Sequence, residues 1–179
     1  FRRVFGRPSG GLARTYRTND ADVVVVALGS VLGTIKDTVD EMREQGHKIG
    51  VLGITCFRPW PSAAVRAALA NAKRIVVLEK SLAVGMGGIV ANNVSASFAG
   101  PPDRVHTVVA GLGGRSITRT SLRRVFEQAL ADSLEPLQFL DLDRALVDRV
   151  LERERLQRRS GPIAEGILRD IGVVAAKTG

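Results

Sequence analysis

Residues 21–33 read ADVVVVALGSVLG, and this stretch decides the fold. Four consecutive valines have restricted χ1 angles and favour a strand that is covered on both faces. Gly29 and Gly33 bracket a turn, and Ser30 is a suitable N-cap for a helix that follows. Apolar residues then recur on one helical face as far as Gly46, a residue typical of a helix C-terminus. The stretch therefore predicts a strand that leads directly into a helix.

The same alternation of strand and helix continues along the chain. Further strands are expected at residues 49–55, 74–79 and 104–110, and further helices at 62–71, at 89–99 and after a cap at Thr120. Strands that alternate with helices form parallel sheets, because a crossover helix returns the chain to the same edge. We therefore expect residues 20–132 to form a three-layer αβα domain with a four- to five-stranded, mostly parallel sheet.

The two ends of the chain differ from this central region. Residues 1–19 are rich in glycine and arginine and predict a basic linker or arm without regular elements. As an arm, they would lie over a partner subunit or an anionic ligand. Residues 133–179 predict a helical extension, with a charged amphipathic helix at 141–159 and a shorter one at 163–174. A short appendage of this kind docks either on its own domain or, as we favour, on another subunit.

The chain starts at Phe1, so we expect it to be the C-terminal piece of a longer polypeptide or to lack its first residues. Its net charge is +8, mostly from dispersed arginines without interleaved aromatics, which favours a basic surface over a nucleic-acid interface. The only cysteine, Cys56, is expected in the core, and it cannot supply a disulfide or a four-thiolate cluster within the chain. A reducing, cytoplasmic location fits best. No apolar run reaches the roughly 18 residues of a membrane span.

The segment FRPWP at residues 57–61 follows the second predicted strand. Prolines at alternate positions impose an extended path. This places Arg58 and Trp60 at the carboxyl end of a parallel strand, where open α/β sheets usually bind other molecules. Trp60 is either a packing residue or an anchor for a protein partner, and Arg58 is either solvated or part of the same interface.

A second candidate follows the third predicted strand, where residues 80–88 read KSLAVGMGG. Gly85, Gly87 and Gly88 allow a close backbone approach, so the stretch suits either a tight turn or subunit contact or, less well, a phosphate site. The pattern is neither GxGxxG nor a Walker sequence, which argues against the phosphate. The adjacent Glu79 and Lys80 predict a structural ion pair.

The sequence offers no self-contained active site. His47 and His106 are the only histidines, and neither belongs to a metal-ligand spacing such as HxxxH. A GxSxG nucleophile motif and a distinctive carboxylate pair are also missing. We therefore predict no catalytic, cofactor-binding or metal-binding residue in this chain.

Several segments nevertheless resemble a known family. In the same order as here, they are similar to the transketolase C-terminal-like domain of pyruvate:ferredoxin oxidoreductase, and more broadly of the 2-oxoacid:acceptor oxidoreductases. The segments are GSVLGTIKDTVDEMREQGHKIG at 29–50, FRPWP at 57–61, VLEKSLAVGMGG at 77–88 and GLGGRSIT at 111–118. FRPWP is the most specific of them. The resemblance covers residues 1–130 and does not extend to the C-terminal helices.

The resemblance implies a part of an alpha-type subunit that completes a larger enzyme. That enzyme would convert a 2-oxoacid, coenzyme A and oxidised ferredoxin to an acyl-CoA, carbon dioxide and reduced ferredoxin. It would hold thiamine diphosphate, Mg²⁺ and iron–sulfur clusters on domains or subunits other than this one. The implied partners are the thiamine-binding and iron–sulfur subunits, and ferredoxin through the complex, with no nucleic acid or membrane.

Two alternatives remain open from the sequence. The chain could be the equivalent domain of another thiamine enzyme, either a 2-oxoacid dehydrogenase beta subunit or a transketolase. Those relatives more often carry a Pro-Leu-Asp-like sequence in place of FRPWP, which favours the oxidoreductase. The chain could also be a stand-alone nucleotide- or nucleic-acid-binding module, which predicts tight binding with a steep salt dependence.

Overall fold

The computed structural model describes residues 2–7, 10–98 and 103–157, with side chains as far as residue 154. The chain divides into two compact units, residues 1–141 and 142–179. The elements in chain order are α1 (Arg2–Phe5), β1 (Ala13–Tyr16), β2 (Val23–Leu28), α2 (Val31–Glu44), β3 (Ile49–Ile54), α3 (Ser62–Leu69), β4 (Arg74–Glu79), α4 (Ile89–Ala96), β5 (Val105–Val109), the 3₁₀ turn η1 (Leu112–Gly114), α5 (Arg119–Leu130), β6 (Leu137–Phe139) and α6 (Arg144–Gln157).

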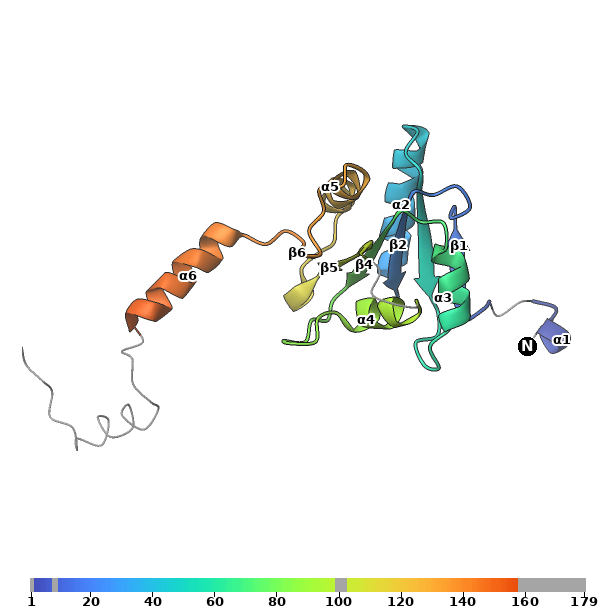
Figure 1. Ribbon diagram of the computed structural model, residues 1–179, viewed down its shortest axis with the longest axis horizontal. Helices are drawn as coiled ribbons and strands as arrows, with labels where there is room; N and C mark the ends of the chain where they lie inside the picture. Colours follow the sequence, from blue (N-terminus) through green and yellow to red (C-terminus); the bar gives the residue numbers. More distant parts are fainter. Residues whose placement is uncertain (1, 8–9, 99–102, 158–179) are drawn as a thin grey trace, which may run out of the picture. The chain divides into compact units, whose positions relative to one another are not determined.

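The first unit is a three-layer αβα domain, as the sequence predicted (Figure 1). Side chains alternate along β2, so successive valines enter different cores. Val23 and Val25 pack with α2 and α5 on one face of the sheet. Val24 and Val26 pack with α3 and α4 on the other face. This two-sided burial explains why the strand is apolar throughout.

The sheet has six strands in the order β1-β3-β2-β4-β5-β6, rather than the four or five expected. β2 to β6 run parallel, and β1 pairs antiparallel with β3. The two additional strands are the short edge strands β1 and β6. The expectation that residues 1–19 lack regular structure was wrong for α1 and β1.

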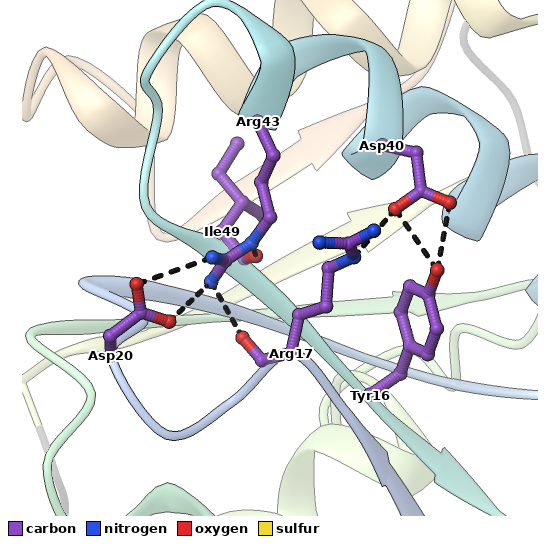
Figure 2. Close-up of polar contacts among 6 residues, drawn as sticks. All are labelled: Tyr16, Arg17, Asp20, Asp40, Arg43 and Ile49. Atoms are coloured by element: carbon purple, nitrogen blue, oxygen red, sulfur yellow. Dashed lines mark hydrogen bonds and ion pairs between the residues drawn. The ribbon is translucent and has the colours of Figure 1, made fainter.

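A polar network fastens β1 and the following turn to α2 (Figure 2). Tyr16 Oη donates to Asp40 Oδ2 at 2.7 Å, and Arg17 Nε lies 2.7 Å from Asp40 Oδ1. Arg43 donates to the carbonyl oxygens of Ile49 at 2.5 Å and Arg17 at 2.7 Å. It also contacts both carboxylate oxygens of Asp20, at 2.8 and 3.2 Å. This network holds the N-terminal segment against the sheet.

The network changes the pKa of two of its members. The hydrogen bond from Arg43 holds the pKa of Asp20 below its ordinary value. Tyr16 and Asp40 raise the pKa of Arg17, with the Tyr16 hydrogen bond as the larger cause. Both shifts favour the charged forms that make the contacts.

Helix starts differ in detail from the sequence expectations. The helix α5 begins at Arg119, and its cap is Thr118, whose Oγ1 accepts from the Ser121 N–H at 3.1 Å, rather than Thr120. Ser30 precedes α2 as expected, but its side chain makes no capping hydrogen bond.

The second unit contains α6 among its described residues, within the predicted helix at 141–159. The helix predicted at 163–174 lies outside the described residues. Among the residues that the structure describes, no helix combines the length and the apolar character needed to cross a membrane.

Candidate functional site

The neighbouring strands β2 and β4 create a crevice at the carboxyl edge of the sheet. The chain leaves β2 toward α2 on one face and leaves β4 toward α4 on the other. Ligands and partners of open α/β sheets bind at such a switch in direction. A hollow of about 350 Å³ lies here, with a smaller one of about 190 Å³. Both are lined by Leu28, Leu78, Glu79 and Lys80.

Glu79 ends β4 and, among the residues that the structure describes, is the one carboxylate that lines these hollows. Its side chain is buried, with 8% exposed. Its two oxygens accept from the backbone N–H groups of Val90 at 2.9 Å and Ala91 at 3.0 Å, in the first turn of α4. A carboxylate at a helix N-terminus satisfies free donors and interacts favourably with the helix dipole. The predicted ion pair with Lys80 was therefore wrong, because Glu79 caps α4 instead.

Gly88 makes this arrangement possible. It has ordinary extended angles, φ −76° and ψ 137°, so backbone conformation does not require glycine here. A Cβ at this position would lie 2.1 Å from Glu79 Oε1 and 3.0 Å from Thr107 Cγ2. Space is the reason for the glycine, because any side chain would displace the carboxylate that caps α4.

The β4–α4 turn, residues 80–88, is held by its own backbone. Gly85 and Gly87 adopt positive φ angles of 82° and 79°, which favour glycine. The N–H of Ala83 donates to the Gly87 carbonyl at 3.0 Å, and the reverse bond is 2.8 Å. The side chains of Val84 and Met86 between them are 103% and 68% exposed. The turn thus presents two apolar side chains from a fixed backbone.

Trp60 and Arg58 lie at the same edge, on the connection after β3. Trp60 is partly buried, packs against the core beside α3 and α4, and donates from Nε1 to Ser97 Oγ at 2.8 Å. Its ring meets Phe57 edge-to-face at 5.8 Å, and Arg58 lies 4.0 Å over the Phe57 ring. Arg58 also donates to Asn93 Oδ1 at 3.2 Å and remains exposed. Trp60 therefore packs against Phe57, and the Arg58 guanidinium stacks on the ring of that same Phe57.

Other reactive side chains are separate from one another. Cys56 is half-buried rather than in the core, and its thiol donates to the Arg58 carbonyl at 3.0 Å. His106 lies in β5 with Nδ1 3.2 Å from the Glu135 carbonyl, and His47 lies in the α2–β3 loop. In the described part of the chain, no three His, Cys, Asp or Glu side chains gather as metal ligands.

The residues that line the crevice do not offer the ligands that the implied cofactors need. Mg²⁺ with a diphosphate requires free oxygen ligands, yet both oxygens of Glu79 are occupied by backbone donors. An iron–sulfur cluster requires several thiolates, and Cys56 is the only cysteine in the sequence. What the edge does offer is exposed apolar and cationic side chains.

Comparison with known proteins shows the family. The family described as pyruvate:ferredoxin oxidoreductase core domain II matches residues 21–122, more than half of the 179 residues. The chain belongs to this family. The matched region spans β2 to the start of α5 and includes the whole crevice.

Individual relatives agree with this assignment. The chain is 37% identical over 154 residues to pyruvate synthase subunit PorA of Methanosarcina barkeri, covering 82% of this chain and 38% of the relative. It is 38% identical over 136 residues to PorA of Thermotoga maritima, covering 75% and 34%. The chain thus spans less than two fifths of the length of these relatives.

A solved structure shows the same fold. The 2-oxoglutarate:ferredoxin oxidoreductase from Magnetococcus marinus, solved with 2-oxoglutarate, coenzyme A and succinyl-CoA bound, matches with a TM-score of 0.56 and 19% identity. The match covers 68% of this chain and 20% of that chain. The similarity supports the αβα architecture described above.

Sequence reasoning pointed to the carboxyl ends of the strands but identified neither the crevice there nor the role of Glu79. Gly85, Gly87 and Gly88 lie in the predicted turn, and of the three only Gly88 lies against Glu79, which lines the hollow. The carboxylate binds helix donors that are 11 and 12 residues away, farther than local capping patterns reach. The glycine immediately before α4 is the signal that could have suggested this contact.

Proposed function

We propose that the chain acts as core domain II of an alpha-type subunit in a pyruvate synthase-type 2-oxoacid:ferredoxin oxidoreductase. The complex would convert a 2-oxoacid, coenzyme A and oxidised ferredoxin to an acyl-CoA, carbon dioxide and reduced ferredoxin. Thiamine diphosphate, Mg²⁺ and iron–sulfur clusters would be held by other domains and subunits. The family match and the PorA relatives support this proposal.

One observation supports a role in assembly rather than in chemistry. At the switch-point crevice, where this topology would place chemistry, the only lining carboxylate among the described residues is engaged in capping α4. We infer that the domain acts through contacts with the rest of the enzyme and that its own residues carry no step of the reaction. We place the assembled enzyme in the cytoplasm, in keeping with the single cysteine.

The interface candidates are Arg58, Trp60 and the turn that contains Gly85, Gly87 and Gly88. Arg58 is exposed, and the turn carries Val84 and Met86 into solvent. Trp60 contributes indirectly, because it packs against Phe57, the ring on which the Arg58 guanidinium stacks. We expect Arg58 and the turn to contact partner subunits directly.

Reconstitution tests the proposal. The tagged chain is expressed with and without the other polypeptides of the enzyme, namely the rest of the alpha-type subunit and the remaining subunits, and pyruvate-dependent, CoA-dependent reduction of a viologen dye is measured. We expect activity and co-purification of thiamine and iron–sulfur subunits only when these other polypeptides are present. Turnover by the chain alone, or a failure to associate with those subunits, would refute the proposal.

A further inference from the structure

Exposed apolar side chains concentrate at the carboxyl edge of the sheet. Between residues 10 and 141, the described large apolar side chains with at least 40% exposure are Leu12, Val84, Met86, Ile89, Leu112 and Leu137. All except Leu137 lie at this edge. Leu12 belongs there because its carbonyl accepts from the N–H groups of Thr55 and Cys56, just beyond β3. The opposite edge has no comparable apolar surface among the described residues.

The turn that carries Val84 and Met86 is ordered before any partner binds. Two backbone hydrogen bonds join Ala83 and Gly87, and Asn92 Nδ2 donates to the Met86 carbonyl at 2.6 Å. A surface that is already ordered loses less conformational entropy on binding than a flexible loop does. The two side chains thus form a preorganised apolar contact.

Charge is distributed unequally between the two edges. The connections after β2, β3, β4 and β5, residues 29–30, 55–61, 80–88 and 110–118, contain Arg58, Lys80 and Arg115 but no Asp or Glu. The connections at the opposite edge carry both signs, with Asp20, Asp22, Asp103, Asp132 and Glu135 beside Arg17, Lys48, Lys73 and Arg104. Asp141, which follows β6, is already held by Arg124 and by Ser121 Oγ. These connections of the carboxyl edge therefore combine exposed apolar side chains with cations and contain no acidic residue.

We propose that this docking edge (Leu12, Arg58, Lys80, Val84, Met86 and Leu112) binds an apolar protein surface that also carries Asp and Glu, on another part of the same oxidoreductase. The inference rests on the proposed function and adds the chemistry of the partner. Charge complementarity determines the sign of the partner's charged groups. The PorA relatives have over 60% of their length beyond the matched region, so additional polypeptide is available to cover the edge.

A protein partner fits this surface better than nucleic acid does. Bases bind to single-stranded sites through stacking on aromatic side chains. The exposed side chains here are aliphatic or thioether, and Phe57 is covered by Arg58. Exposed aliphatic residues beside arginine are instead typical of protein interfaces.

Matched substitutions test the docking edge in the assembled complex. The tagged full chain is titrated with the purified remaining subunits, and affinity is measured by biolayer interferometry at two salt concentrations. We expect Val84→Asp and Met86→Asp each to weaken binding about tenfold or more. Lys80→Glu should weaken binding and reduce its salt dependence. Leu137→Asp and Lys48→Glu, at positions away from this edge, are the controls and should stay within about twofold.

A cross-linking experiment tests the chemistry of the partner. A photoreactive benzoylphenylalanine in place of Met86 should cross-link to peptides of the other subunits that contain several Asp or Glu residues, as identified by mass spectrometry. Cross-linked peptides without carboxylates would overturn the inference.

The remaining outcomes separate this inference from the proposed function. If the wild-type chain binds the other subunits but Val84→Asp and Met86→Asp bind equally well, the docking edge is wrong and the proposed function stands. If the wild-type chain binds none of them, both fail. A dimer of the chain that Met86→Asp dissociates, or binding to phosphatidylglycerol vesicles that Val84→Asp abolishes, would also overturn the inference by assigning the edge to another occupant. Circular dichroism confirms that each variant is folded.

Discussion

The substitution Gly88→Ala tests the link between the sheet and α4. The added methyl group would lie 2.1 Å from Glu79 Oε1 and 2.8 Å from Glu79 Cδ, far inside van der Waals contact. The carboxylate cannot move away without loss, because both of its oxygens bind N–H groups of α4. We therefore expect the substitution to displace Glu79 and leave helix donors unsatisfied.

The size of the stability loss follows from the two hydrogen bonds that Glu79 accepts. A hydrogen bond to a charged group contributes about 1.5–3 kcal/mol, so losing one or both lowers the free energy of unfolding by roughly 2–5 kcal/mol. For a chain of this size the melting temperature should fall by about 5–20 °C. Backbone strain adds nothing, since the φ of −76° suits alanine.

Urea denaturation of the full chain, followed by far-UV circular dichroism, measures the effect. A double-mutant cycle with Glu79→Ala isolates the contact. In the Glu79→Ala background the clashing oxygens are absent, so Gly88→Ala should cost less than about 1 kcal/mol, from the remaining contact with Thr107. The coupling free energy between Gly88→Ala and Glu79→Ala should therefore equal most of the loss that Gly88→Ala causes by itself.

An equal cost for Gly88→Ala in both backgrounds would refute this reasoning. The matched control is Gly33→Ala, because a Cβ at this position of α2 meets no atom within 4 Å. It should stabilise the protein by about 0.5–1 kcal/mol, as alanine does in a helix interior.

Three further substitutions probe the supporting contacts. Trp60→Phe keeps a ring but removes the donor to Ser97, so the free energy of unfolding should fall by about 0.5–1.5 kcal/mol. A variant as stable as the wild type in thermal denaturation would contradict this. Arg43→Lys retains the charge, but a lysine cannot donate to both backbone carbonyls, so the free energy of unfolding measured by urea titration should fall by about 1–3 kcal/mol. An unchanged free energy would show that these contacts are dispensable. The pKa of Asp20 is lowered in the folded state by Arg43, so its carboxylate stabilises the protein above about pH 4 and this contribution is lost as the pH falls through the lower folded value. Asp20→Asn should therefore be less stable than wild type at pH 7, with the difference shrinking below about pH 4, and a constant difference across that range would exclude the linkage.

The strongly patterned elements were predicted well from the sequence. β2 and α2 follow from the valine run and the recurring apolar face, and the bounds of β4 match residues 74–79. These segments bury apolar residues at a fixed period, so local sequence carries their structure. The three-layer αβα class follows from the order of the elements.

The edge strands and the site needed information from distant residues. β1 and β6 have four and three residues, too few for a periodic pattern, and their neighbours in the sheet determine their conformation. The sequence left two roles open for Trp60, core packing and a protein interface. Its hydrogen bond to Ser97 depends on a residue 37 positions along the chain. Glu79 was misread for the same reason, since its partners lie in the next helix rather than beside it.

The edge strands β1 and β6 also determine where the chain can be truncated. Residues 21–122, the part shared with the family, include neither β1 nor β6. A fragment cut at those limits would leave the outer backbone groups of β3 and β5 unpaired, and open strand edges recruit other chains into aggregates. Soluble fragments should therefore include residues 10–141.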